Sequence, residues 1–126
     1  ISEFLSVFEI DPRRALDGFD GIFDACGEIS SAPCPPVSRK VRADDIDFNS
    51  HLTNVKYLPR AIEALPDEFL AARRLAGYAI KFRREARLGE TVESSARVSG
   101  DCALHELAVG GRPAASVATL WAQGGI

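Results

Sequence analysis

Three polar side chains at alternate positions, Asp47, Asn49 and His51, are the residues of this chain best suited to chemistry. In an extended segment, side chains alternate between the two sides of the backbone, so these three would project from one side. A carboxylate can orient or accept a proton, an amide can donate two hydrogen bonds, and histidine titrates near neutral pH. The trio is therefore a candidate hydrolytic site, with turn and helix-cap roles as the competing interpretation.

The composition is that of one globular domain. The 126 residues are 46% hydrophobic and 26% charged, which is enough for a core and excludes disordered and collagen-like chains. No apolar run approaches the roughly 20 residues that span a bilayer, and the N-terminus lacks the layout of a signal peptide. With a net charge of -3, nucleic acid is not expected as a partner, and neither is a membrane.

The three cysteines, Cys26, Cys34 and Cys102, are an odd number and have no C-x-x-C spacing. This pattern disfavours a disulfide framework and a zinc site, so we expect inert thiols, no metal and no cofactor. Cys102 and His105 lie three positions apart, on opposite faces of an expected strand, and do not suit a nucleophile and its base. A reducing, cytoplasmic setting fits these features.

Residues 1–36 are expected to form an N-terminal segment and a linker. An apolar run over 4–10 is followed by a stretch with apolar side chains at helical spacing, namely Phe19, Ile22, Phe23 and Cys26. Three prolines within 33–36 then predict an extended connection. The sequence starts at Ile1 and contains no methionine, so we expect it to be part of a longer product.

Residues 37–126 are expected to form the main domain. A short strand over 37–42 precedes a helix whose apolar stripe recurs at helical spacing: Leu52, Val55, Leu58, Ile62 and Leu65. Pro66 marks the end of this helix, and Pro59 predicts a kink or a later start. A second helix over 67–75 and strands over 78–88, 91–98, 103–109 and 113–122 follow. This order resembles the hotdog fold, an α+β architecture in which an antiparallel five-stranded sheet wraps around one long helix.

The stretch from Asp45 to Leu58, DIDFNSHLTNVKYL, resembles the signature of the plant-type and bacterial acyl-[acyl carrier protein] (acyl-ACP) thioesterases. The stretch Phe82–Ala86 and the pair Thr119 and Trp121 resemble the same family, so the likeness covers about residues 37–123. Members usually carry two hotdog repeats in one chain, with the catalytic residues in the second. The resemblance therefore implies that residues 1–36 include the tail of a preceding repeat.

The resemblance implies catalytic roles for Asp47, Asn49, His51 and Glu85. The family typically has a cysteine after the glutamate, where this chain has Ala86, so a covalent thiol mechanism is closed to it. We expect water to be activated by Glu85 or His51, with Asp47 orienting its partner and Asn49 binding the thioester carbonyl. The identity of the base stays open, and for Glu85 a surface salt bridge is an equal alternative.

Substrate contacts are expected at Asn54, at the start of the helix, and at Arg83 and Arg87. A strand continuing to residue 88 would place Arg83 and Arg87 with Lys81 on one face, where they could dock an acidic carrier protein. An ordinary solvated charged face is the competing interpretation.

We therefore expect a thioester hydrolase of fatty acid biosynthesis that releases fatty acid from acyl-ACP in the cytoplasm. The alternatives are a hotdog thioesterase acting on coenzyme A esters and a non-catalytic repeat that binds acyl chains or serves assembly. A single hotdog exposes a sheet edge, so we also expect a homo-oligomer or pairing with a missing N-terminal repeat.

Overall fold

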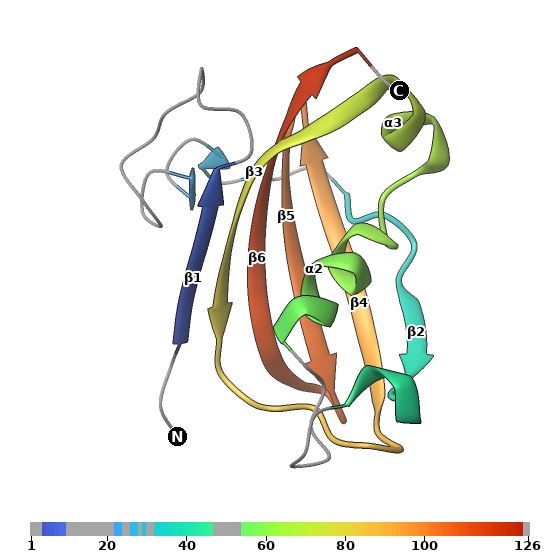
Figure 1. Cartoon of the computed structure of the whole chain (residues 1–126). Coiled ribbons are helices and arrows are strands. Elements are labelled where there is room, and N and C mark those ends of the chain that lie inside the picture. The colour runs from blue at the N-terminus through green and yellow to red at the C-terminus, as the bar shows by residue number, and fades with distance from the viewer. Residues whose placement is uncertain are drawn as a thin grey trace.

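The computed structural model describes residues 4–9, 22–23, 26–27, 29, 32–46 and 54–124. These residues form one antiparallel sheet in the order β1-β3-β6-β5-β4-β2, which curves around helix α2 (Figure 1). The strands are β1 (Phe4–Glu9), β2 (Val37–Lys40), β3 (Arg73–Phe82), β4 (Thr91–Ser99), β5 (Cys102–Val109) and β6 (Arg112–Gln123). The helices are α2 (Asn54–Ile62), α3 (Asp67–Ala72) and a 3-10 helix, Ala43–Asp45.

The predicted α+β hotdog architecture is confirmed, with β2 to β6 as its five strands and α2 as its helix. The boundary between the second helix and the next strand was predicted wrongly: β3 begins at Arg73, although the second helix was expected to continue through Leu75. Arg73 pairs with Gln123 and stacks its guanidinium 4.2 Å from the centroid of the Phe69 ring. Cross-strand pairing therefore overrides the local helical pattern here.

Strand β1 adds a sixth strand that comes from the N-terminal segment. It pairs antiparallel with β3, from Phe4 opposite Phe82 to Glu9 opposite Gly77. In Figure 1 it lies at one edge of the sheet, beside β3. Strand β3 thus has a neighbour on each side, and the sheet ends at β1 and β2.

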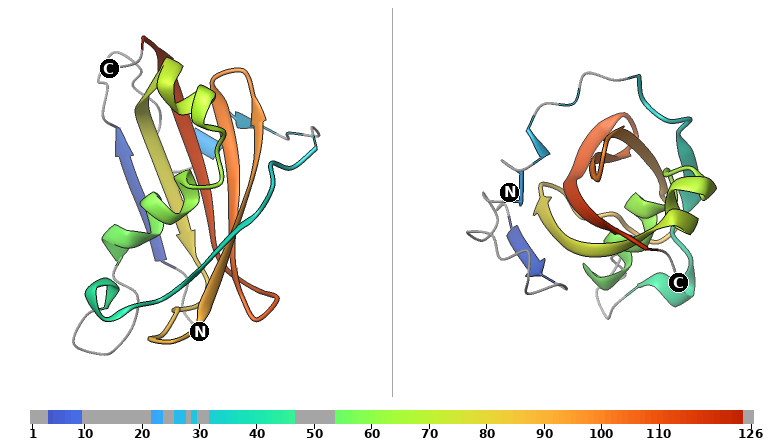
Figure 2. Two further views of the ribbon diagram at one scale, coloured as in Figure 1. Left: turned by 90° about the vertical axis from the view of Figure 1, so that its right-hand side faces the viewer. Right: turned by 90° about the horizontal axis from the view of Figure 1, so that it is seen from above.

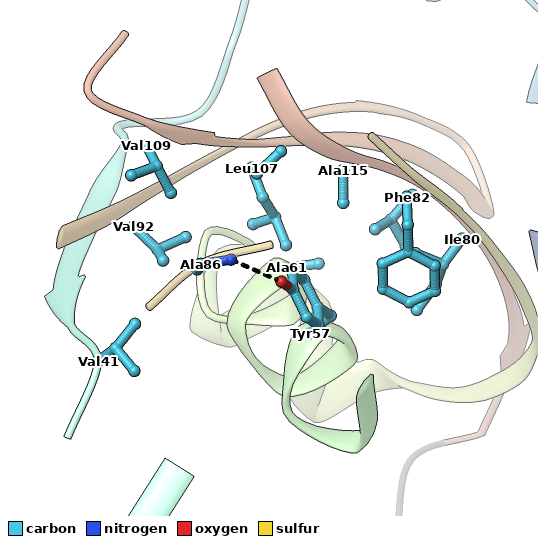
Figure 3. Close-up of a cluster of buried hydrophobic side chains, with 12 residues drawn as sticks. Val41, Tyr57, Ala61, Ile80, Phe82, Ala86, Val92, Leu107, Val109 and Ala115 are labelled. Atoms are coloured by element: carbon cyan, nitrogen blue, oxygen red, sulfur yellow. Dashed lines mark hydrogen bonds between the residues drawn. The ribbon is translucent and has the colours of Figure 1, made fainter. Parts of the chain in front are cut away.

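The inner face of the sheet, which we define as the face against α2, carries the largest buried cluster (Figure 3). Tyr57 and Ala61 bring the helix into this cluster with exposed fractions of 1% and 0%, whereas Leu58 and Ile62 are only half-buried. The buried stripe of α2 is therefore rotated from the predicted one. The methyl side chain of Ala61 allows the helix to lie close to the sheet, and the larger side chains flank it.

The helix is shorter than its apolar pattern suggested. Pro59 lies inside α2, and the helix ends at Ile62 instead of continuing to Leu65. Its last turn tightens, because the Leu65 amide donates to the Ile62 carbonyl at 2.9 Å, an i to i-3 bond. The predicted later start of the helix falls at residues 47–53, which lie outside the described part of the chain.

The outer face of the sheet is covered in part by the N-terminal segment. Ile22 and Cys26 are buried against Ala79, Ala118 and Leu120. From above, the described part of the extended connection to β2, residues 32–36, runs around the outside of the curved sheet (Figure 2). Residues Ala114 to Trp121 of β6 are consequently buried on both faces. None of the described helices is long and apolar enough to cross a membrane.

Candidate active site

A hydrogen bond from the Ala86 backbone to the Tyr57 side chain holds the loop after β3 against helix α2. The Ala86 N–H donates to the Tyr57 hydroxyl at 3.1 Å, and both residues are buried (Figure 3). The Tyr57 ring packs edge-on against Phe82, with ring centroids 5.0 Å apart. The Glu85 side chain, directly before Ala86, is exposed. Its place beside the helix is thus set by its buried neighbour.

The negative charge of Glu85 acts on the hydroxyl of Tyr57. Burial is the main cause that raises the pKa of Tyr57, and the negative charge of Glu85 raises it further. The hydroxyl of Tyr57 therefore stays protonated, and the Glu85 carboxylate lies close enough to disfavour a second negative charge. Glu85, a predicted catalytic residue, therefore lies near Tyr57 in the first half of α2. Tyr57 is three positions after Asn54.

A buried ion pair fastens the approach to the helix. Arg60 donates to Asp45 Oδ2 at 2.8 Å and to the carbonyls of Arg39 and Lys40 at 2.9 and 3.1 Å. Asp45 also accepts the Arg42 N–H at 3.0 Å, and this hydrogen bond, then Arg60, lowers the pKa of Asp45. The pair therefore ties Asp45, which precedes the predicted catalytic segment, to the last turn of the helix that follows it.

His105 holds the same last turn of α2, next to Arg60, from the inner face of β5. Its Nδ1 lies 2.9 Å from the Ala61 carbonyl and its Nε2 lies 2.8 Å from Thr119 Oγ1. Burial lowers the pKa of His105 to about 4, so the ring is neutral, with the Nδ1 proton donated to Ala61. Thr119 Oγ1 donates to Nε2 and accepts the Trp121 Nε1–H at 2.8 Å. Each polar group in this chain of hydrogen bonds has a partner, so the chain fixes the position of α2 on the sheet.

The predicted catalytic residues fall into two groups. Asp47, Asn49 and His51 lie outside the described residues. Glu85 lies within the described part of the chain, close to Tyr57. Asn54, a predicted substrate contact, is the first residue of α2.

The basic cluster does not form as expected, because β3 ends at Phe82 and the strand prediction through residue 88 is wrong. The amides of Arg83 and Arg84 both donate to the Ala114 carbonyl, which breaks the two-residue period. The Arg83 guanidinium donates to Ser116 Oγ and lies 4.0 Å from Glu106, on the outer face. Arg87 is exposed, and its N–H donates to Glu90 Oε1 at 2.7 Å.

A surface pocket of about 470 Å³ lies away from Tyr57, between the proline-rich connection and strands β4 and β5. Its lining includes Pro33, Cys34, Arg97, Leu104 and Glu106. Within the part of the chain that the structure describes, no group of three or more His, Cys, Asp or Glu side chains is placed to hold a metal ion.

Residues 37–123 match the family model described as the acyl-ACP thioesterase C-terminal domain, which is more than half of the chain. The chain belongs to this thioesterase family. Its relatives include the chloroplastic dodecanoyl-[acyl-carrier-protein] hydrolase of Cinnamomum camphora, with 32% identity over 59 residues, 47% of this chain and 15% of that protein.

Solved structures show the same fold. The 12:0-ACP thioesterase of Umbellularia californica superposes with a TM-score of 0.69 at 21% identity, over 80% of this chain and 41% of that chain. An acyl-ACP thioesterase of Bacteroides thetaiotaomicron gives a TM-score of 0.64 at 17% identity, over 76% and 41% of the two chains. This member of the thioesterase family thus spans less than half the length of these relatives.

Two functional contacts of this thioesterase domain were not predicted from its sequence. Tyr57 lies inside the signature stretch, and a helical tyrosine on a buried face needs a hydrogen-bond partner, which is a signal for its role. Asp45 is the first residue of the signature and Arg60 lies two positions after its end, but such opposite charges are usually solvated. Only their burial identifies them as an anchor.

Proposed function

We propose that this chain is the catalytic part of an enzyme that hydrolyses the thioester of acyl-ACP to a free fatty acid and the carrier thiol. The observation that carries the proposal is the family match over residues 37–123, which includes the Asp47, Asn49 and His51 motif together with Glu85. The Tyr57 to Ala86 hydrogen bond supports it, because it ties Glu85 to the helix that follows this motif.

The proposed reaction uses a water molecule in place of a protein nucleophile. Glu85 or His51 removes a proton from the water, whose oxygen attacks the thioester carbonyl carbon. Asn49 donates to the carbonyl oxygen as its negative charge develops, with help from backbone amides near Asn54, and Asp47 orients its partner. Collapse of the tetrahedral intermediate breaks the carbon–sulfur bond, and the sulfur takes up the proton.

Ala86 excludes a covalent route through the residue after Glu85. Its side chain is a methyl group with an exposed fraction of 0%, and its N–H is bonded to Tyr57. This position therefore contributes to catalysis through the backbone, by holding the loop, and not through a thiol.

An acidic carrier protein is the partner that we propose for Arg87. This side chain is exposed on the same loop as Glu85, so it could contact a carrier that delivers its acyl group to the helix start. Arg83 is less available to contact the carrier protein, because its guanidinium is bound by Ser116 and Glu106 on the outer face.

We also propose that the enzyme acts in the cytoplasm and works as an assembly of paired hotdogs, either as a homo-oligomer or with a preceding repeat. The three free thiols support a reducing compartment. The outer edge of β1 supports further pairing, because an edge strand presents backbone groups that can bond another strand.

The decisive assay measures hydrolysis of acyl-ACP and acyl-coenzyme A over a range of chain lengths by the complete protein that contains this chain. We expect hydrolysis of acyl-ACP, with Glu85→Gln and His51→Ala each lowering kcat by about 10²- to 10⁴-fold. Glu93→Gln is the matched control, since Glu93 is also an exposed glutamate but lines the surface pocket, away from Tyr57.

Near-normal kcat in Glu85→Gln would refute water activation by Glu85. Equal or better turnover of coenzyme A esters would refute the carrier specificity, and an inactive protein that still binds acyl-ACP would identify a non-catalytic repeat.

A further inference from the structure

Two thiols that are far apart in the sequence meet on the outer face of the sheet. Cys26, from the N-terminal segment, and Cys102, at the start of β5, belong to the cluster built around Ile22, Ala118 and Leu120. We expected all three cysteines to be inert from their spacing alone, and the fold changes that expectation for this pair.

The contacts of Cys26 place it over the first residues of β5. Its Sγ lies 3.7 Å from the Thr119 carbonyl oxygen and 4.0 Å from the carbonyl oxygen of Ala103, which is 77 positions further along the chain. Ala103 pairs with Thr119 and follows Cys102 directly. The Cys102 side chain packs against the same buried cluster as Cys26 and lies close enough to raise the pKa of the Cys26 thiol.

The third thiol is held elsewhere. The Cys34 amide donates to the Ala96 carbonyl at 2.7 Å, and its side chain packs against the cluster that contains Phe69 and Trp121. Cys34 and Cys102 are both half-buried, but they pack against different clusters.

We propose that Cys26 and Cys102 form a reversible disulfide under oxidising conditions, which links the N-terminal segment to the outer face of the hotdog sheet. The oxidant we specify is a small-molecule disulfide of the glutathione type. Two protein thiols lose two electrons and two protons, and one molecule of that disulfide is reduced to two thiols.

The order of steps follows from burial. Cys102 is half-buried and attacks the small disulfide first, which releases one small thiol and leaves a mixed disulfide on Cys102. Burial, and then the adjacent Cys102, raises the pKa of Cys26 to about 12, so this thiol is a poor first attacker. Cys26 then gives up its proton, attacks the Cys102 sulfur and releases the second small thiol.

The cross-link would lie on the outer face of the sheet and would make no contact with α2 on the inner face. It would hold the turn at Cys26 against the β5–β6 pair, whose inner face carries Thr119 and His105. Because it joins residues distant in sequence, it restricts the unfolded chain strongly.

The test incubates the native chain with oxidised glutathione, blocks the remaining thiols with an alkylating reagent, and maps the peptides by mass spectrometry. We expect one linked peptide pair, Cys26 with Cys102, which a dithiol reductant separates again. The melting temperature should rise by about 5 to 10 °C on oxidation.

Cys34→Ala is the matched control and should keep both the linked pair and the rise in melting temperature. Cys102→Ala should lose both, and Cys26→Ala should stop at one glutathione on Cys102. The peptide map of the unchanged chain decides the matter even where a variant fails to fold. A link that includes Cys34, a Cys102 adduct that never resolves to Cys26, or a cross-link without thermal stabilisation would overturn the proposal.

Discussion

At the scale of single residues, Tyr57 is the link between the helix and the loop that carries Glu85. Its hydroxyl accepts the Ala86 N–H inside the core, where a backbone donor without a partner is costly. Tyr57 is thus a positioning residue, because it acts on Glu85 through the backbone of the next residue.

We predict that Tyr57→Phe lowers kcat by about tenfold or more with little change in KM, because Glu85 loses its fixed position while substrate contacts remain. The free energy of unfolding should fall by about 1 to 3 kcal/mol. Tyr78→Phe is the matched control, since it removes the other tyrosine hydroxyl of the chain, four positions before Phe82 on β3. A Tyr57→Phe enzyme with unchanged kcat would show that the loop keeps its position without this bond.

At the scale of elements, the last turn of helix α2 is held by buried polar groups from two directions. Arg60 is paired with Asp45, which precedes the helix in the chain, and His105 of β5 binds the carbonyl of the next residue, Ala61. These contacts orient the helix relative to the sheet, whereas the apolar contacts of Tyr57 and Ala61 supply burial without direction.

The lowered pKa of His105 predicts a loss of stability in mild acid. Unfolded histidine takes up a proton near pH 6.5 and the folded ring only near pH 4, so the unfolded state binds more protons between these values. The stabilising contribution is complete above pH 6.5 and falls by up to about 3 kcal/mol as the pH drops towards 4.

Urea unfolding at a series of pH values measures this slope. In His105→Gln, which is less stable at pH 7 but carries no titrating ring, the slope between pH 6.5 and 4 should become flatter. An equal slope in both proteins would assign the acid sensitivity to other groups.

At the scale of the whole molecule, β1 decides how the sheet ends. It pairs with six consecutive positions of β3, from Phe82 to Gly77, and so covers an edge that would otherwise present a ten-residue strand. An uncovered edge of that length favours pairing with another chain.

Adjacent positions of β1 offer a matched pair of variants. In an edge strand, the N–H groups of successive residues point alternately towards and away from the neighbouring strand, so Ser6→Pro and Val7→Pro differ in whether a ladder bond is lost. One of the two should lose about 1 to 3 kcal/mol of stability and form larger assemblies than the unchanged chain, as judged by urea unfolding and sedimentation velocity. The other should sediment like the unchanged chain. If neither variant differs from it, β1 does not protect this edge.

Local patterns in the sequence were sufficient for the order of elements and for the family. Apolar periods, prolines and glycine turns marked α2 and strands β4, β5 and β6 to within a few residues, because these signals come from neighbouring positions. The signature around Asp47, Asn49 and His51 identified the candidate site for the same reason, since its residues are contiguous in the chain.

Only the tertiary structure decided which distant groups meet. The bond between Ala86 and Tyr57 joins positions 29 apart, and the contact of Cys26 with Ala103 joins positions 77 apart. Strand register and the path of the N-terminal segment set such contacts, and neither leaves a periodic trace in the sequence. The same limit explains why Arg83 and Arg87 do not share a strand face, since β3 ends at Phe82 and the two-residue period does not reach Arg87.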